Sequence, residues 1–139
     1  TFRAHGVKVD GTRVYLREGQ LLKALETVPQ QFTIEARNPE RNVTVGGGRP
    51  VFAPGYGAPF LVDAAPLDDG GPRWVGKRAP TLDDYDKLVK LAHALPNQDM
   101  SGHLIVEPEG VPAGMAPVRM LHAHMLHSDK PFIGSAARP

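Results

Sequence analysis

The chain has 139 residues, a formal net charge of +1 and no cysteine, and it contains 15 glycines and 14 prolines. This length suits one domain, and so much glycine and proline excludes a bundle made mainly of long helices. The near balance of 16 basic and 15 acidic residues gives no basic excess of the kind that nucleic-acid-binding domains carry. The lack of cysteine excludes disulfides, thiolate zinc sites and cysteine nucleophiles, and it favours a reducing compartment.

Apolar runs in the sequence are short. None approaches the length of about 20 residues that a membrane-spanning helix needs. The first residues also lack a basic segment followed by an apolar one, which is the pattern of a secretion signal. We therefore expect a soluble, cytoplasmic protein that interacts with neither membrane nor nucleic acid.

A hairpin and a short helix are the first expected elements. Residues alternate between apolar and polar over Thr12–Leu16, directly after the turn pair Asp10-Gly11, which is a hairpin signal. Leucine and valine then recur at helical spacing over Glu18–Val28 and stop before Pro29. The sequence predicts a short amphipathic helix there.

Three short strands are expected next. Alternation over Phe32–Ala36 is followed by a turn at Asn38-Pro39, a strand over Asn42–Val45, a turn at Gly46–Gly48 and a strand at Val51-Phe52. Residues 1–63 are thus predicted to form a small antiparallel β segment with one short helix. This segment leads into the first of the strands that alternate with helices further along the chain.

Residues 64–80 are rich in Pro, Gly, Asp and Arg, so we expect a loop. Thr81 then fits the N-cap of a helix with Asp84 at its third position, and the helix is expected to end at Pro96. A short apolar run at Leu104–Val106, a second amphipathic helix over residues 112–127 and a strand from Lys130 follow.

The order from about residue 50 is strand, helix, strand, helix, strand. Such alternation predicts an α/β fold with parallel strands joined by right-handed crossovers. A sheet of only three parallel strands would leave one face and both edges uncovered. Residues 81–139 are therefore expected to be part of a larger α/β structure.

The segment Phe52–Phe60 is the most unusual in the sequence, because two prolines and two glycines bracket Tyr56. It is interpreted either as a ligand-facing loop, with Tyr56 as an aromatic wall or hydroxyl donor, or as a tight turn between core strands. It is not a phosphate-binding loop, since the glycine patterns of such loops are absent.

Asp99, Ser101 and His103 alternate just before an apolar run and could share one strand face. A catalytic triad is disfavoured, because residues two apart on one strand do not form the required hydrogen-bonded series. Polar ligand contacts at a strand end and solvated loop polarity both stay open.

Three histidines lie on the second predicted helix, at positions 122, 124 and 127. They lack the spacing of a zinc-binding helix and no third protein ligand can be named, so no metal site is expected and a metal-dependent hydrolase is disfavoured. Surface or helix-terminal histidines are the plainer interpretation.

Several motifs together resemble the trimethylamine methyltransferase family, from about Gly6 to Ser135. They are Phe32–Gly47, Val51–Phe60, Leu95–Asn97 with Ser101-Gly102, Val106–Pro108 and Ser128–Ser135. The resemblance implies a cobamide-dependent enzyme of methylamine metabolism and methanogenesis, which moves a methyl group from a methylated or quaternary amine to the Co(I) of a separate corrinoid protein. It also implies a (β/α)8 TIM barrel, of which this chain would supply about three parallel strands and two helices.

On this resemblance, the barrel strands correspond to residues 52–60, 99–106 and 130–135. Because active sites of such barrels lie at the carboxyl ends of the strands, the substrate-binding candidates are Tyr56, Ser101, Gly102, His103 and Ser135. His103 departs from the small residue expected in relatives. No catalytic residue is nominated, and the 139 residues alone are expected to be inactive.

No cofactor is expected to bind this chain directly, since the cobamide would be carried by the corrinoid protein. The uncovered sheet edges predict a homo-oligomer. The alternative function is that of a truncated, non-catalytic relative that acts as an oligomerising or partner-binding module. The amine itself is not specified by the sequence.

Overall fold

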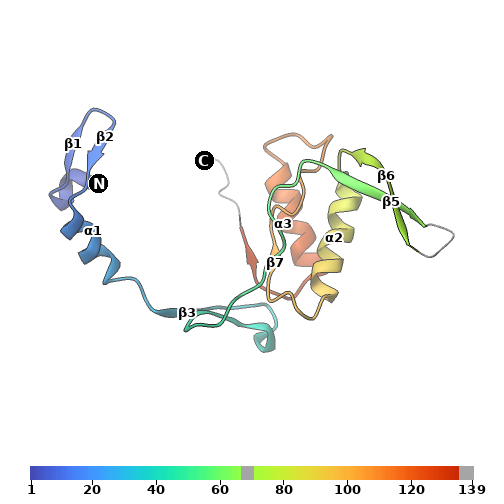
Figure 1. Ribbon diagram of the computed structural model, residues 1–139, viewed down its shortest axis with the longest axis horizontal. Coiled ribbons are helices and arrows are strands. Elements are labelled where there is room, and N and C mark those ends of the chain that lie inside the picture. The colour runs from blue at the N-terminus through green and yellow to red at the C-terminus, as the bar shows by residue number, and fades with distance from the viewer. Residues whose placement is uncertain (67–70, 135–139) are drawn as a thin grey trace. The chain divides into compact units, whose positions relative to one another are not determined.

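The computed structural model describes residues 1–66 and 71–134, and the chain divides into two units, Thr1–Phe32 and Thr33–Pro139. Figure 1 shows the elements of both in chain order. No helix in these described ranges is long and apolar enough to cross a membrane.

The first unit contains a one-turn 3-10 helix η1 (Phe2–His5), the strands β1 (Lys8–Asp10) and β2 (Arg13–Tyr15), and the helix α1 (Glu18–Leu25). The strands pair antiparallel across Gly11, which has a φ of 54°. The predicted hairpin and helix are confirmed, although α1 ends three residues before Val28. A unit of this size buries little, and Val7 is its one buried apolar residue among the described positions.

Strand β3 (Gln31–Ile34) pairs with β4 (Val43–Gly46), as the alternation predicted. A 3-10 turn η2 (Pro39–Arg41) connects them, and the Asn38 side chain caps it by accepting a hydrogen bond from the Glu40 amide at 3.1 Å. The predicted Gly46–Gly48 turn is also present, with all three glycines at positive φ.

Residues 64–80 differ from the expected loop. Strands β5 (Leu61–Pro66) and β6 (Pro72–Arg78) pair antiparallel, with a register shift between Asp63 and Ala64. Most of the described side chains of this hairpin are exposed on both faces, and Trp74 is 68% exposed. Because neither face is buried, these strands lack the apolar and polar alternation by which a strand is recognised in sequence.

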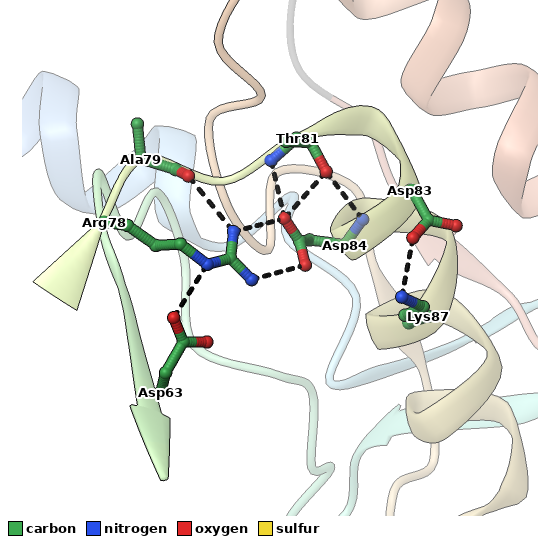
Figure 2. A network of polar contacts seen from close by, with 7 residues as sticks. All are labelled: Asp63, Arg78, Ala79, Thr81, Asp83, Asp84 and Lys87. Carbon is green, nitrogen blue, oxygen red and sulfur yellow. Dashed lines mark hydrogen bonds and ion pairs between the residues drawn. The ribbon is translucent and has the colours of Figure 1, made fainter. Parts of the chain in front are cut away.

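The base of this hairpin is tied to the next helix by Arg78 (Figure 2). Its guanidinium contacts both carboxylate oxygens of Asp84, at 2.6 and 2.8 Å, and its Nε donates to Asp63 at 2.8 Å. The paired guanidinium, together with Thr81, lowers the pKa of Asp84. The hydrogen bonds to Asp84 and then to Asp63 raise the pKa of Arg78.

Helix α2 (Leu82–Ala94) begins as predicted. Thr81 Oγ1 accepts from the Asp84 amide at 3.2 Å, and the Asp84 carboxylate accepts from the Thr81 amide at 2.8 Å. This reciprocal pair satisfies two amides that the first helical turn leaves unpaired. Helix α3 (Ala116–His127) lies beside α2 in Figure 1.

Helix α3 starts later than the expected residue 112. The Pro112 carbonyl accepts from the amides of Met115 and Ala116 in a separate turn, at 2.8 and 3.1 Å. Pro117 instead occupies the first turn of the helix, where a missing amide hydrogen costs nothing.

Three chain segments run side by side in the same direction. The Phe52 carbonyl accepts from the amides of Asp99 and Met100, and Ala58 forms a parallel bridge with Val106. On the other side, β7 (Ser101–Gly102) pairs parallel with β8 (Phe132–Ile133). The segment 99–107 therefore lies between 52–58 and 130–133.

These segments are less regular than the strands expected there. No regular strand is formed at Val51-Phe52 or through 52–58, within the described residues. Pro54 and Pro59 cannot donate hydrogen bonds to a ladder, and Gly57 adopts a φ of 70°, so a continuous strand is prevented. The strands expected over residues 99–106 and 130–135 are also shorter than expected, because β7 ends at Gly102 and β8 ends at Ile133.

The core of the second unit lies between the two helices and the middle segment. Its buried apolar members are Tyr85, Val89, Val106, Met120 and Ala123. Leu88, Leu104, Ile105 and Ala116 pack against them while partly buried. Helix α2 thus buries the face that carries Tyr85, Val89 and Ala92.

Candidate functional site

Tyr56 lies at an exposed bend of the segment 52–58. Its side chain is 52% exposed, and its hydroxyl donates to the Ile133 carbonyl at 3.1 Å. Because the segment 99–107 lies between 52–58 and β8, this hydrogen bond spans the middle segment. The hydroxyl is therefore engaged by protein, while much of the ring remains accessible.

The backbone around Tyr56 is held by its neighbours. The Gly57 amide donates to the Leu104 carbonyl at 2.6 Å, and the Ala58 amide donates to the Ile105 carbonyl at 3.3 Å. Gly57 has a φ of 70°, which a residue with a side chain rarely adopts. The bend is thus fixed on one side of Tyr56 by this glycine and its hydrogen bond.

Ser101 and His103 are placed differently from Tyr56. Ser101 is fully buried and His103 is 3% exposed. Ser101 hydrogen-bonds to His124 of α3, and the His103 ring stacks on the His124 ring with centroids 6.1 Å apart. Both side chains therefore pack against the helical layer and do not reach the surface where Tyr56 is exposed.

Gly102, between them, is buried. A methyl group built on it would meet Pro54 and Ile105 at about 3.5 Å, an ordinary contact distance. The structure thus brings Gly102 close to the Tyr56 segment through Pro54. Ser135, the remaining predicted site residue, lies outside the described residues.

Sequence reasoning missed a buried series of polar side chains. Tyr85 Oη lies 3.0 Å from His124 Nε2, and His124 Nδ1 lies 3.0 Å from Ser101 Oγ. Tyr85 and Ser101 are 0% exposed and His124 is 1% exposed. We call these three side chains the Ser101–His124–Tyr85 relay. Tyr85 stands at helical spacing with the apolar residues Leu88, Val89 and Ala92, and nothing in that spacing shows that its hydroxyl finds a partner.

Donor and acceptor chemistry fixes the direction of this relay. The Tyr85 hydroxyl donates its single hydrogen to the His103 carbonyl, which can only accept. Its oxygen must therefore accept from Nε2–H of His124. In the neutral imidazole, Nδ1 then carries no hydrogen and accepts from the Ser101 hydroxyl, whose oxygen also lies 3.5 Å from the Pro131 carbonyl.

Burial agrees with that neutral form. Removal from water, and then the neighbouring His103, lower the pKa of His124 to about 4. Burial also raises the pKa of Tyr85. The His124 ring also packs against the Phe132 ring, with centroids 5.6 Å apart, and the His103 and Phe132 centroids lie 6.5 Å from each other. At neutral pH the relay therefore carries no net charge.

The geometry does not assemble a nucleophilic triad. Ser101 and His124 are in hydrogen-bond contact, but the second nitrogen of His124 faces a phenol in place of a carboxylate. The Asp99 carboxylate instead accepts from the Phe52 amide at 2.9 Å. Since Ser101 is fully buried, no substrate can reach its hydroxyl in this arrangement.

The histidines of α3 have separate environments. His122 is exposed, His124 is buried in the relay, and His127 lies 3.7 Å from Asp86. Within the described ranges, no group of three His, Asp or Glu side chains converges as metal ligands would.

A groove of about 290 Å³ lies beside α3, where Arg37 and Lys130 contribute its cationic side chains. Arg37 donates to the Met125 carbonyl, while Lys130 Nζ donates to the Ala92 and Leu95 carbonyls at 2.9 and 2.7 Å. Both cations are thus used within the protein, and we assign no ligand to this groove.

Comparison with known proteins places the chain in context. The family model described as trimethylamine methyltransferase matches residues 1–139. A protein named glycine betaine methyltransferase, from Desulfitobacterium hafniense (strain Y51), is 44% identical over 135 residues. The match covers 97% of this chain and 26% of that relative, so the chain spans about a quarter of the relative's length.

Proposed function

This chain belongs to the trimethylamine methyltransferase family, and on that premise we propose that the protein containing it transfers a methyl group from a methylated or quaternary amine to the Co(I) of a corrinoid protein. The name of the 44% identical relative supports a quaternary amine such as glycine betaine as the substrate. In this proposal the chain provides part of the substrate pocket.

The proposed architecture is a partial (β/α)8 barrel. Its support is the set of parallel segments 52–58, 99–107 and 130–133, with α2 and α3 between them in sequence. The carboxyl ends of parallel strands carry the active site in barrels of this class. Tyr56 and Ile133 lie toward that end of their segments, which supports placing the substrate there.

The accessible ring of Tyr56 is the observation that carries the proposal. A quaternary nitrogen has no N–H to donate, so it is held by aromatic faces and not by hydrogen-bond acceptors. Because the Tyr56 hydroxyl already donates to Ile133, the residue offers its ring face. We propose that this face forms one wall of the site for the methylated nitrogen.

The cobalt would supply the nucleophile, and in this proposal the corrinoid protein carries it. The described residues of this chain contribute binding and orientation. Tyr56 would hold the ammonium group, and the buried strand β7 would help to keep that wall rigid. A low-water environment around the nitrogen strengthens the attraction between the cation and the ring.

Methyl transfer to a reduced corrinoid protein tests the proposal. The protein at its natural length would be incubated with trimethylamine, glycine betaine, carnitine and proline betaine, and formation of methylcobamide would be followed spectroscopically. We expect turnover of one quaternary or tertiary methylamine. The acceptor would be a corrinoid protein whose gene lies beside the gene of this protein. If no methyl group is transferred to it from any of the four amines, the proposal is contradicted.

A second candidate function is a non-catalytic module that binds a partner or a second copy. The exposed apolar side chains of α1 and of the turn that follows favour it, namely Leu21, Leu22, Leu25 and Val28. This candidate predicts association without methyl transfer, so the same assay separates the two.

A further inference from the structure

The buried relay ends on a main-chain carbonyl that lies next to the segment holding Tyr56. Tyr85 donates to the His103 carbonyl, and the following carbonyl, that of Leu104, accepts from the Gly57 amide at 2.6 Å. Gly57 directly follows Tyr56. A continuous series of hydrogen bonds and one peptide unit thus connects α3 to the exposed aromatic ring.

We propose that Tyr85 and His124 are positioning residues for Tyr56, acting through the carbonyls of His103 and Leu104. The proposal deepens the proposed function and rests on it in one respect, that Tyr56 is taken as the wall for the substrate. Neither Tyr85 nor His124 would touch the substrate, because both are buried beneath the middle segment.

The backbone just beyond β7 is oriented by a side chain. Strand β7 ends at Gly102, and the carbonyl of the next residue, His103, accepts from the Tyr85 hydroxyl. A side-chain hydroxyl aimed at a buried carbonyl fixes its direction. Tyr85 supplies that hydroxyl from the neighbouring helix.

His124 in turn fixes the Tyr85 hydroxyl. With Nε2–H donating to the phenol oxygen, the hydrogen of Tyr85 is left to point at the carbonyl. Apolar side chains in place of Tyr85 and His124 would fill the same space without the cost of burying polar atoms, so filling space does not explain this pair. Buried polar groups with every atom partnered specify one arrangement of the chain, and this is the role we assign to the relay.

Tyr85→Phe in the protein at its natural length is the direct test, because it removes the hydroxyl and keeps the ring. Hydrogen exchange of the Gly57 and Ala58 amides should become about tenfold faster, which corresponds to the loss of about one hydrogen bond. Tyr15→Phe is the matched control, since it removes the same atom from an exposed tyrosine in the first unit. It should leave these amides unchanged.

Variants of His124 provide a second test, which does not depend on whether Tyr85→Phe folds. His124→Gln keeps a side-chain N–H that can reach Tyr85 and should restore most of the amide protection that His124→Leu loses. Nitrogen chemical shifts of the His124 ring should show hydrogen on Nε2 in the unaltered protein. Hydrogen on Nδ1 instead, or equal protection in the Gln and Leu variants, overturns the proposal.

Kinetics separates this proposal from the proposed function. With the amine that the protein turns over, Tyr85→Phe should raise KM about 3- to 10-fold with little change in kcat, since a misplaced wall weakens binding. Unchanged Gly57 exchange in a folded variant overturns the positioning role, whatever the activity. Faster exchange with an unaltered KM supports the positioning role and overturns the assignment of Tyr56 as substrate wall.

Discussion

The hydroxyl of Tyr56 donates to the carbonyl of Ile133, 77 residues further along the chain, at 3.1 Å. This contact couples the first and third of three parallel segments across the second. It also decides which part of Tyr56 is offered to a ligand. The ring face is accessible, whereas the polar atom is used by the protein.

Tyr56→Leu should lower kcat/KM about 3- to 30-fold, because it keeps apolar bulk and removes a ring attraction of about 0.5 to 2 kcal/mol. Tyr56→Phe should lose less, since it keeps the ring and loses only the hydrogen bond to Ile133. Steady-state kinetics on both variants checks this. Normal turnover by Tyr56→Leu, accompanied by a sharp loss of thermal stability, would make the segment a structural turn only.

Gly57→Ala should destabilise the protein by about 1 to 2 kcal/mol, because a Cβ is disfavoured at a φ of 70°. Gly55→Ala is the matched control on the other side of Tyr56, where φ is not positive and nothing lies within 4 Å of an added Cβ. Denaturant unfolding compares the two variants. Equal stabilities would contradict the role given to the bend.

Lys130→Met should destabilise the second unit by about 1 to 3 kcal/mol, because the variant keeps the buried stem but leaves the last carbonyls of α2 without their donor. Lys90→Met removes an exposed lysine from the same helix and should have little effect. Thermal unfolding of both variants gives the comparison, and similar losses would contradict the capping role of Lys130.

Stability should fall on acidification because of His124. Its pKa is about 4 in the folded protein and about 6.5 in an unfolded chain, so the unfolded state takes up a proton first as the pH falls. The free energy of unfolding should therefore decrease between about pH 6.5 and 4, by up to about 3 kcal/mol. Urea unfolding at a series of pH values measures this dependence.

His124→Gln should remove that part of the pH dependence, although its stability at neutral pH will be lower. His122→Gln changes an exposed histidine of the same helix and should retain the dependence. Tyr85 and His103 are the titratable groups in contact with the His124 ring, and Arg37 and Lys130 line the adjacent groove. A pH profile that is identical in both variants would assign the effect to another group.

The isolated 139-residue chain should self-associate. Its first unit leaves apolar side chains of α1 about half exposed, with values of 48% for Leu21 and 55% for Leu25. Contiguous exposed apolar surface of this kind favours association. Light scattering at tens of micromolar gives the mass, and a clean monomer would contradict the expectation.

Turns, helix caps and amphipathic helices could be predicted from the sequence, because they depend on residues that are neighbours along the chain. The capping pair of Thr81 and Asp84, the turn at Gly11 and the apolar spacing of α2 and α3 each involve residues within a few positions of one another. The family also followed from short motifs in a fixed order, and the whole-chain match confirms it. The unusual composition around Tyr56 marked a bend that the structure contains.

Tertiary structure decided the features that depend on distant partners. The β5–β6 hairpin buries neither face, so its strands left no periodic signal, and its base is fixed by Arg78 contacting Asp84. Ser101 and His103 are ligand-contact candidates in the sequence, and it is the fold that buries both side chains against His124 of α3. The partners of Tyr85 lie 18 and 39 positions away along the chain, and only folding brings such atoms within hydrogen-bond distance.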